Sequence, residues 1–97
     1  MIYHIVCFRF KPDTPAKAIA AAGAALKAMQ GKIPGIEGVL WGPNLGPSAV
    51  EYSHILTVML DSMDSLTPYL EHPVHKAVIA DHLAPIRIAR FAIDIEV

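Results

Sequence analysis

Apolar and polar positions along the chain follow two periods, one typical of strands and the other typical of helices. Over residues 2–10 apolar side chains occupy both alternating sets of positions, and His4 is the polar member of its set. This pattern predicts a strand that is buried on both faces. Over residues 16–29 apolar residues recur every three or four positions, which predicts a helix that Asp13 or Thr14 would cap.

The same two periods continue through the rest of the chain. Three further segments, each bounded by turn residues, are predicted strands: 39–41, 51–60 and 87–97. Residues 42–47, rich in glycine and proline, are predicted to form a loop. Before the last strand we predict a second helix that Ser62 caps, that Pro73 interrupts and that continues to about Leu83. The predicted order is strand, helix, strand, strand, helix, strand.

This order is that of the ferredoxin-like split βαβ fold (β-α-β-β-α-β), an α+β arrangement of four antiparallel strands with two helices on one face. The segments 2–10 and 51–60 are apolar on both faces, so a single copy would expose an apolar patch on the face without helices. In the last strand Arg90, Asp94 and Glu96 alternate with apolar residues, which predicts one solvated face. We expect two copies to pack sheet to sheet as a homodimeric α/β barrel.

Composition and charge narrow the function classes and the compartment. The 97 residues suit a single domain over positions 1–97, and 54% of them are apolar against 18% charged. A net charge of -1 with scattered lysines and arginines argues against nucleic-acid binding, and no apolar run is long enough to predict a membrane span. The single cysteine, Cys7, lies in an apolar strand without an intrachain partner, which favours a cytoplasmic location and a buried, unreactive thiol.

Four short motifs, in an order and spacing that agree with this topology, resemble the stress-responsive A/B barrel family. They are HIVCFRFK at 4–11, WG at 41–42, YSHI at 52–55 and, most specific, YLEHPVH at 69–75. The resemblance spans the whole chain and implies a homodimeric ferredoxin-like α/β barrel. Most members of the family have no assigned chemistry, whereas one cyclises a linear polyketide.

Carried over by motif, the resemblance implies roles for three residues. The working histidine of the polyketide-cyclising member matches His75, its tyrosine matches Tyr69, and a further pocket histidine matches His4. At three positions where that enzyme has bulky aromatic residues, this chain has non-aromatic residues instead: Ala22, Gly23 and Ile86. The pocket is therefore expected to have another shape, and the same substrate is not expected.

The residue types themselves indicate acid/base chemistry. The imidazole of His75 can remove a proton next to a carbonyl group, and the Tyr69 phenol can donate a hydrogen bond to the resulting enolate, with His4 supporting both. Three further residues are expected to line the ligand pocket: His54, Leu26 and Phe8. In the alternative interpretation, His4 and His54 are core histidines with satisfied hydrogen bonds, Tyr69 packs its ring and His75 borders a helix.

The histidines also raise the possibility of a metal or haem site. His72, His75 and His82 are separated by spacings that can share a helical face. Pro73 disturbs that register and no carboxylate completes a ligand set, so we expect neither a metal nor a cofactor. We expect His72 to cap a helix or to contact a second copy.

The sequence therefore leaves two functions open and does not decide whether the protein is an enzyme. In the first, the protein is a stable homodimer that binds a small apolar ligand without turnover. In the second, it is a polyketide-cyclase-like acid/base enzyme or lyase that acts on an apolar carbonyl compound. A cavity shared by His4, Tyr69 and His75 would favour the enzyme, whereas a space filled by apolar side chains of the first helix and strand would favour the binding protein.

Overall fold

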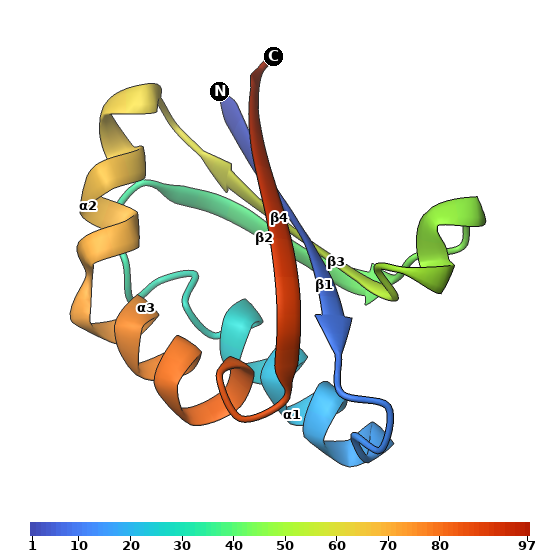
Figure 1. The fold of residues 1–97 in the computed structure, drawn as a ribbon. Helices are drawn as coiled ribbons and strands as arrows, with labels where there is room; N and C mark the ends of the chain where they lie inside the picture. The colour runs from blue at the N-terminus through green and yellow to red at the C-terminus, as the bar shows by residue number, and fades with distance from the viewer.

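The computed structural model describes all residues from Met1 to Val97 and shows one sheet with helices on one side (Figure 1). The four strands are β1 (Ile2–Phe10), β2 (Ile36–Pro43), β3 (His54–Leu60) and β4 (Arg87–Glu96). The three α-helices are α1 (Ala16–Lys27), α2 (Leu66–Glu71) and α3 (Pro73–Val78). Two short 3-10 turns and one π-helical turn complete the secondary structure: Pro47–Val50, Met63–Ser65 and Ile79–Leu83.

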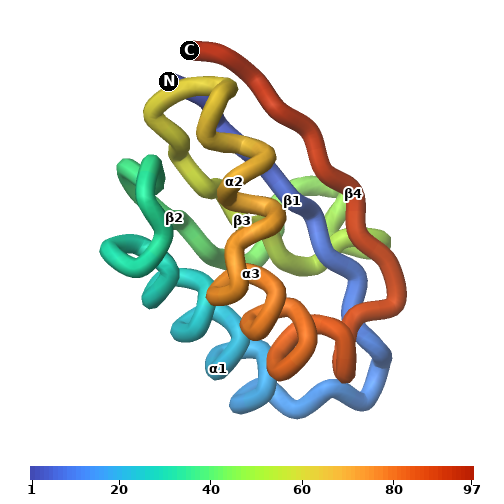
Figure 2. Tube along the Cα trace, turned by 90° about the vertical axis from the view of Figure 1, so that its left-hand side faces the viewer, coloured from blue at the N-terminus to red at the C-terminus, as the bar shows by residue number.

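All four strands are antiparallel in the order β2-β3-β1-β4, which places β3 and β1 in the middle of the sheet. The register pairs His4 of β1 with Val58 of β3 on one side and with Asp94 of β4 on the other. Directly paired residues share a face of the sheet. Figures 1 and 2 show the three helices on the same side of the sheet. The arrangement confirms the predicted ferredoxin-like split βαβ fold.

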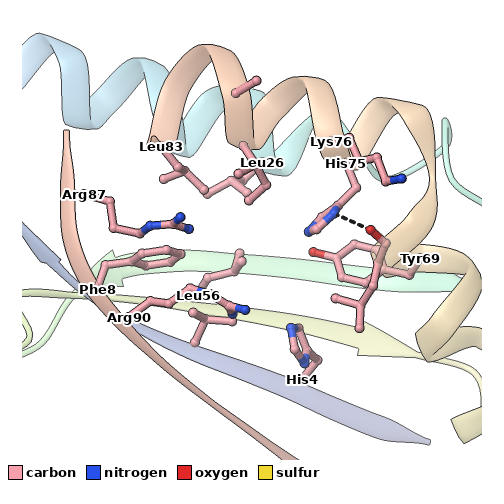
Figure 3. Close-up of a pocket in the computed structure, with 14 residues that line it drawn as sticks. His4, Phe8, Leu26, Leu56, Tyr69, His75, Lys76, Leu83, Arg87 and Arg90 are labelled. Carbon is pink, nitrogen blue, oxygen red and sulfur yellow. Dashed lines mark hydrogen bonds between the residues drawn. The ribbon is translucent and has the colours of Figure 1, made fainter. Parts of the chain in front are cut away.

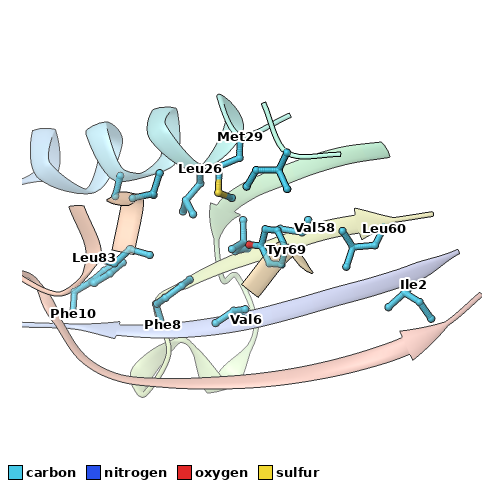
Figure 4. Close-up of a cluster of buried hydrophobic side chains, with 14 residues drawn as sticks. Ile2, Val6, Phe8, Phe10, Leu26, Met29, Val58, Leu60, Tyr69 and Leu83 are labelled. Atoms are coloured by element: carbon cyan, nitrogen blue, oxygen red, sulfur yellow. The ribbon is translucent and has the colours of Figure 1, made fainter. Parts of the chain in front are cut away.

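The core lies between the helices and the covered face of the sheet (Figure 4). Alternate positions of β1 point into it, as the period of two predicts, and all five are buried: Ile2, His4, Val6, Phe8 and Phe10. Leu26 and Met29 from the α1 side and Leu83 from the π-helical turn are fully enclosed opposite the sheet. Burial of each large apolar side chain stabilises the fold by about 1.5–3 kcal/mol. This layer therefore holds the helices against the strands.

The second predicted helix is divided in two at Pro73, as the sequence suggested, and ends in a π-helical turn. A residue before proline is disfavoured in the helical region, and His72 has an extended conformation with ψ at 136°. Its Nδ1 accepts a hydrogen bond from the Val74 amide at 3.1 Å and so caps α3. Ideal helical spacing would turn Tyr69 and His75 to different faces, and the break removes that constraint.

Helix capping differs from the prediction at both expected positions. Neither Asp13 nor Thr14 caps α1, because Pro15 occupies the N-cap position and the Thr14 hydroxyl donates to the Lys11 carbonyl at 2.7 Å. Ser62 makes no capping hydrogen bond either.

Strand β2 is longer and β3 is shorter than predicted. Pairing with β3 extends β2 from Ile36 to Pro43, so the predicted loop begins only at Asn44. The Asn44 amide then donates to the Ser53 carbonyl at 2.8 Å, and β3 starts at His54. The ends of β2 and β3 are set by pairing between the two strands, and the alternation of apolar and polar residues within one strand does not predict that pairing.

The other face of the sheet is apolar and open. In β4 the residues Phe91, Ile93 and Ile95 are about half exposed on this face. They lie opposite three residues of β1: Cys7, Ile5 and Tyr3. Cys7 is half-buried in a single copy, less than the predicted buried thiol. None of the helices combines the length and apolar character needed to cross a bilayer.

Candidate functional site

A cavity of about 330 Å³ lies between the helical layer and the sheet (Figure 3), at the small end of the range for small-molecule sites. The strands form its floor with Val6, Phe8 and Leu56, and Leu26 and Leu83 form part of its roof. Its polar lining comes from β1, the two short helices and β4: His4, Tyr69, His75, Lys76, Arg87 and Arg90. The space is therefore apolar in its walls and holds the three residues implied by the motifs.

His75 presents one ring nitrogen to the cavity as a base. Its Nδ1 lies 3.0 Å from the Leu70 carbonyl oxygen, and because a carbonyl only accepts, Nδ1 carries the proton and Nε2 keeps its lone pair (Figure 3). Burial lowers the pKa of His75 below 6.5, against the opposing effect of this hydrogen bond. Unfavourable electrostatic interactions with His4, Arg90 and His72 lower the pKa of His75 further. His75 is therefore neutral at pH 7.

Tyr69 presents a protonated hydroxyl to the same space. Its side chain is 1% exposed, and its ring centroid lies 4.6 Å from that of His75. The Tyr69 hydroxyl makes no hydrogen bond within the protein. Because every fully enclosed polar side-chain atom in the structure has a hydrogen-bond partner, this hydroxyl is not fully enclosed and opens onto the cavity. Burial raises the pKa of Tyr69 above its usual 10.0, although Arg90 opposes this shift. The phenol is a neutral hydrogen-bond donor.

His4 is held in place by Asp94, a residue that the sequence analysis did not place at the site. The two residues pair across β1 and β4, and Asp94 Oδ1 accepts a hydrogen bond from His4 Nδ1 at 2.7 Å. The His4 ring is buried and meets the Tyr69 ring edge-on, with centroids 5.8 Å apart. A carboxylate in this position fixes the orientation and tautomer of an imidazole. His4 is thus a positioned polar group beside Tyr69.

Two arginines and a lysine also line the cavity and were missed by the sequence analysis. Arg87 and Arg90 extend into it from β4, and Lys76 follows His75 on α3. The polar positions of β4 are solvated at the sheet edge, as predicted, yet Arg90 and Asp94 point toward the helical side. The signal was available: once Phe91 and its alternating apolar neighbours take the open face, the polar set must take the other.

His54 does not join this cavity, contrary to the prediction that it lines the pocket with Leu26 and Phe8. Its ring stacks on Trp41, with centroids 5.5 Å apart, and its Nδ1 lies 2.9 Å from the Ser53 hydroxyl. Burial lowers the pKa of His54 below 6.5. It borders a separate hollow beside α1, where a Cβ atom on Gly23 would meet the Trp41 ring at 2.5 Å.

The remaining histidines are not brought together. His72 caps α3, His75 bonds the Leu70 carbonyl, and His82 borders a hollow on the other side of the helices. No group of three histidine, cysteine or carboxylate side chains is close enough to hold a metal ion. The rings that contact Tyr69 belong to two histidines, His4 and His75.

Comparison with known proteins places this chain in a family. The sequence matches the profile described as Stress responsive A/B Barrel Domain over residues 2–97. The chain belongs to the stress responsive A/B barrel family. A search of curated proteins found no significant match to this A/B barrel chain.

Solved structures share the fold of this A/B barrel protein over its whole length. A dimeric ferredoxin-like protein of unknown function from Thermobifida fusca is 28% identical, with a TM-score of 0.83 and coverage of 99% of this chain and 90% of that one. One from Bacteroides fragilis, also described as dimeric and of unknown function, is 27% identical, with a TM-score of 0.77 and coverage of 99% and 95%. The hydroxynitrile lyase of Passiflora edulis is 21% identical, with a TM-score of 0.84 and coverage of 99% and 92%.

Proposed function

We propose that this A/B barrel protein is an acid/base enzyme that moves a proton at the carbon next to a carbonyl group. The observation that carries this proposal is the convergence of a neutral His75 and an unengaged Tyr69 hydroxyl on one cavity. A base with its lone pair free and a donor aimed at the same space are the two groups that enolisation requires. A cavity shared by His4, Tyr69 and His75 thus favours the enzyme over the binding protein.

The proton transfer balances with the groups present. Nε2 of His75 takes the proton from the carbon, the electron pair of the broken C–H bond forms the carbon–carbon double bond, and the carbonyl π electrons move to oxygen. Tyr69 donates a hydrogen bond to the enolate oxygen so formed. The imidazolium of His75 then returns the proton to carbon, or the enolate carbon attacks a second carbonyl group of the same substrate and the imidazolium protonates the alkoxide so formed, as in a cyclase.

The surroundings favour the charged intermediate over the neutral substrate. Arg90 lies close enough to affect both Tyr69 and His75 electrostatically, and an apolar lining strengthens such interactions by lowering the local dielectric constant. The Passiflora edulis enzyme is a lyase with this fold. At 21% sequence identity, that likeness indicates only that the fold can hold a lyase site. The substrate of this chain has to be inferred from its own cavity.

Deuterium exchange of a small ketone tests the proposal. In D₂O, the benzylic protons of phenylacetone are expected to exchange at least about 100-fold faster with the protein than with free imidazole at the same concentration, as measured by proton NMR. Because burial lowers the pKa of His75 from 6.5, the rate is expected to hold below pH 6.5 and to fall only as the pH drops through the lowered pKa. Because the pKa of Tyr69 is raised above 10.0, no alkaline loss is expected below pH 10.

Free imidazole is the control for both parts of this test, because it titrates at its ordinary pKa. An exchange rate no higher than that of imidazole at every pH would contradict the proposal. The A/B barrel protein would then be a binding protein without turnover.

We also infer that two copies of the chain pair through the open face of the sheet. That face is apolar in β1 and β4, and two related structures are described as dimeric. Light scattering is expected to give twice the chain mass of 10.5 kDa, and Ile93→Lys, at the middle of the exposed row, to give the monomer. Leu45→Lys, at a loop residue 90% exposed, is the matched control. A wild-type mass of one chain would contradict the inference.

A further inference from the structure

One end of the cavity holds two guanidinium groups without an acidic partner. Arg87 is half-buried, Arg90 is exposed at the sheet edge, and both line the cavity from β4 (Figure 3). The ion pair in this structure is between His4 and Asp94. No carboxylate lies within 4.0 Å of either arginine. A partly buried cation without a counter-charge is costly unless something else pairs with it. The cost of an unpaired cation therefore falls on Arg87.

The rest of the polar lining adds no negative charge. No aspartate or glutamate lines the cavity, whereas Lys76 does. Asp94, the nearest candidate on the same strand face, is already bonded to His4 at 2.7 Å. The effect of Arg90 on both Tyr69 and His75 places its charge close to the reacting groups. The electrostatic character of the cavity is therefore positive, although its walls are mostly apolar.

Arg87 and the acid/base pair lie at different ends of the space, and Arg90 reaches from the side of Arg87 toward the middle. In Figure 3, Arg87 extends from β4 beside Phe8 and the Arg90 side chain runs toward His4, while Tyr69 and His75 face the cavity from the end opposite Arg87. A guanidinium group binds a carboxylate through two parallel charge-assisted hydrogen bonds, which fix the orientation as well as the position of the ligand. A ligand anchored at the arginines would extend along the apolar walls toward Tyr69.

We propose that the substrate is a small carbonyl compound that also carries a carboxylate, with the carboxylate bound by Arg87 and Arg90 and the carbonyl group at Tyr69 and His75. This inference rests on the proposed function and names its substrate class. It adds a carboxylate to the apolar carbonyl compound expected from the sequence, because both arginines line the cavity. The apolar walls between the two ends fit an aryl or alkyl body.

A pair of ligands that differ only in charge tests the inference. We would titrate the protein with 3-phenylpropanoate and with 3-phenylpropanamide and follow the backbone amide resonances of the cavity residues by NMR. The carboxylate is expected to bind at least about 10-fold more tightly than the amide, since charge-assisted hydrogen bonds are the stronger ones. In the double variant Arg87→Gln, Arg90→Gln the ratio of the two dissociation constants is expected to fall toward one.

The matched control is Lys11→Gln, Lys17→Gln, which removes the same charge at exposed positions outside the cavity and is expected to keep the preference. Equal binding of acid and amide by the wild type would overturn the inference, as would binding of neither at millimolar concentration. A preference that survives in a folded arginine variant would also overturn it. Phenylacetone has no carboxylate, so its exchange reports on the proposed function alone and separates the two failures.

Discussion

Replacing His75 with glutamine is expected to slow the exchange of phenylacetone protons by about 10²-fold to 10⁴-fold, the range that a positioned general base contributes. Glutamine keeps an amide that can donate to the Leu70 carbonyl, as the His75 Nδ1 does at 3.0 Å. It has no lone pair of suitable basicity at the position of Nε2. The measurement is the initial exchange rate of wild type and variant at one pH, with the fold of each checked by its amide NMR spectrum.

The matched control is His82→Gln, because His82 lies on the same helical segment but borders a different hollow. Its exchange rate is expected to stay within about two-fold of wild type, in line with the small effects of substitutions away from a site. Loss of the acidic limb of the pH profile in His75→Gln would identify His75 as the titrating base. Equal rates for His75→Gln and wild type, with both folded, would remove His75 from the mechanism.

The sequence predicts the fold well because each strand reports its own burial. The alternation around His4 in β1 and the fully apolar pattern of β3 are local signals, and they identify both segments as central strands of the sheet. Proline at position 73 is also a local signal, since its effect falls on the preceding residue. The break between Tyr69 and His75 is therefore predictable from the amino-acid sequence alone.

What the sequence does not report is set by pairing between distant segments. The His4–Asp94 hydrogen bond joins residues 90 positions apart, and it depends on the register of β4 against β1. The side of the sheet to which Arg90 points depends on which set of β4 residues takes the open face. His54 was placed at the pocket because it alternates with core residues, yet Trp41 of the neighbouring strand covers it. In each case a second strand decides the outcome.

Replacing Tyr69 with phenylalanine is expected to slow the same exchange by about 10²-fold to 10³-fold, the usual loss when one donor to a developing oxyanion is removed. The ring stays in the core, where Tyr69 is 1% exposed, so the fold is expected to persist. The free energy of unfolding, measured with urea, is expected to change little, because no protein hydrogen bond engages the lost hydroxyl. A donor that acts only on ligand is distinguished in this way from one that holds the structure.

Tyr52→Phe is the control for the chemical change itself, since Tyr52 packs near Phe91, with centroids 6.4 Å apart, and does not line the cavity. It is expected to leave the exchange rate unaltered. If Tyr69→Phe also leaves the rate unaltered while keeping the stability of the wild type, the hydroxyl does not stabilise the enolate. If instead it lowers the rate without moving the acidic limb of the pH profile, the two roles separate. The limb belongs to the base, His75, and the loss belongs to the oxyanion donor, because the neutral phenol does not titrate in the pH range where the imidazole does.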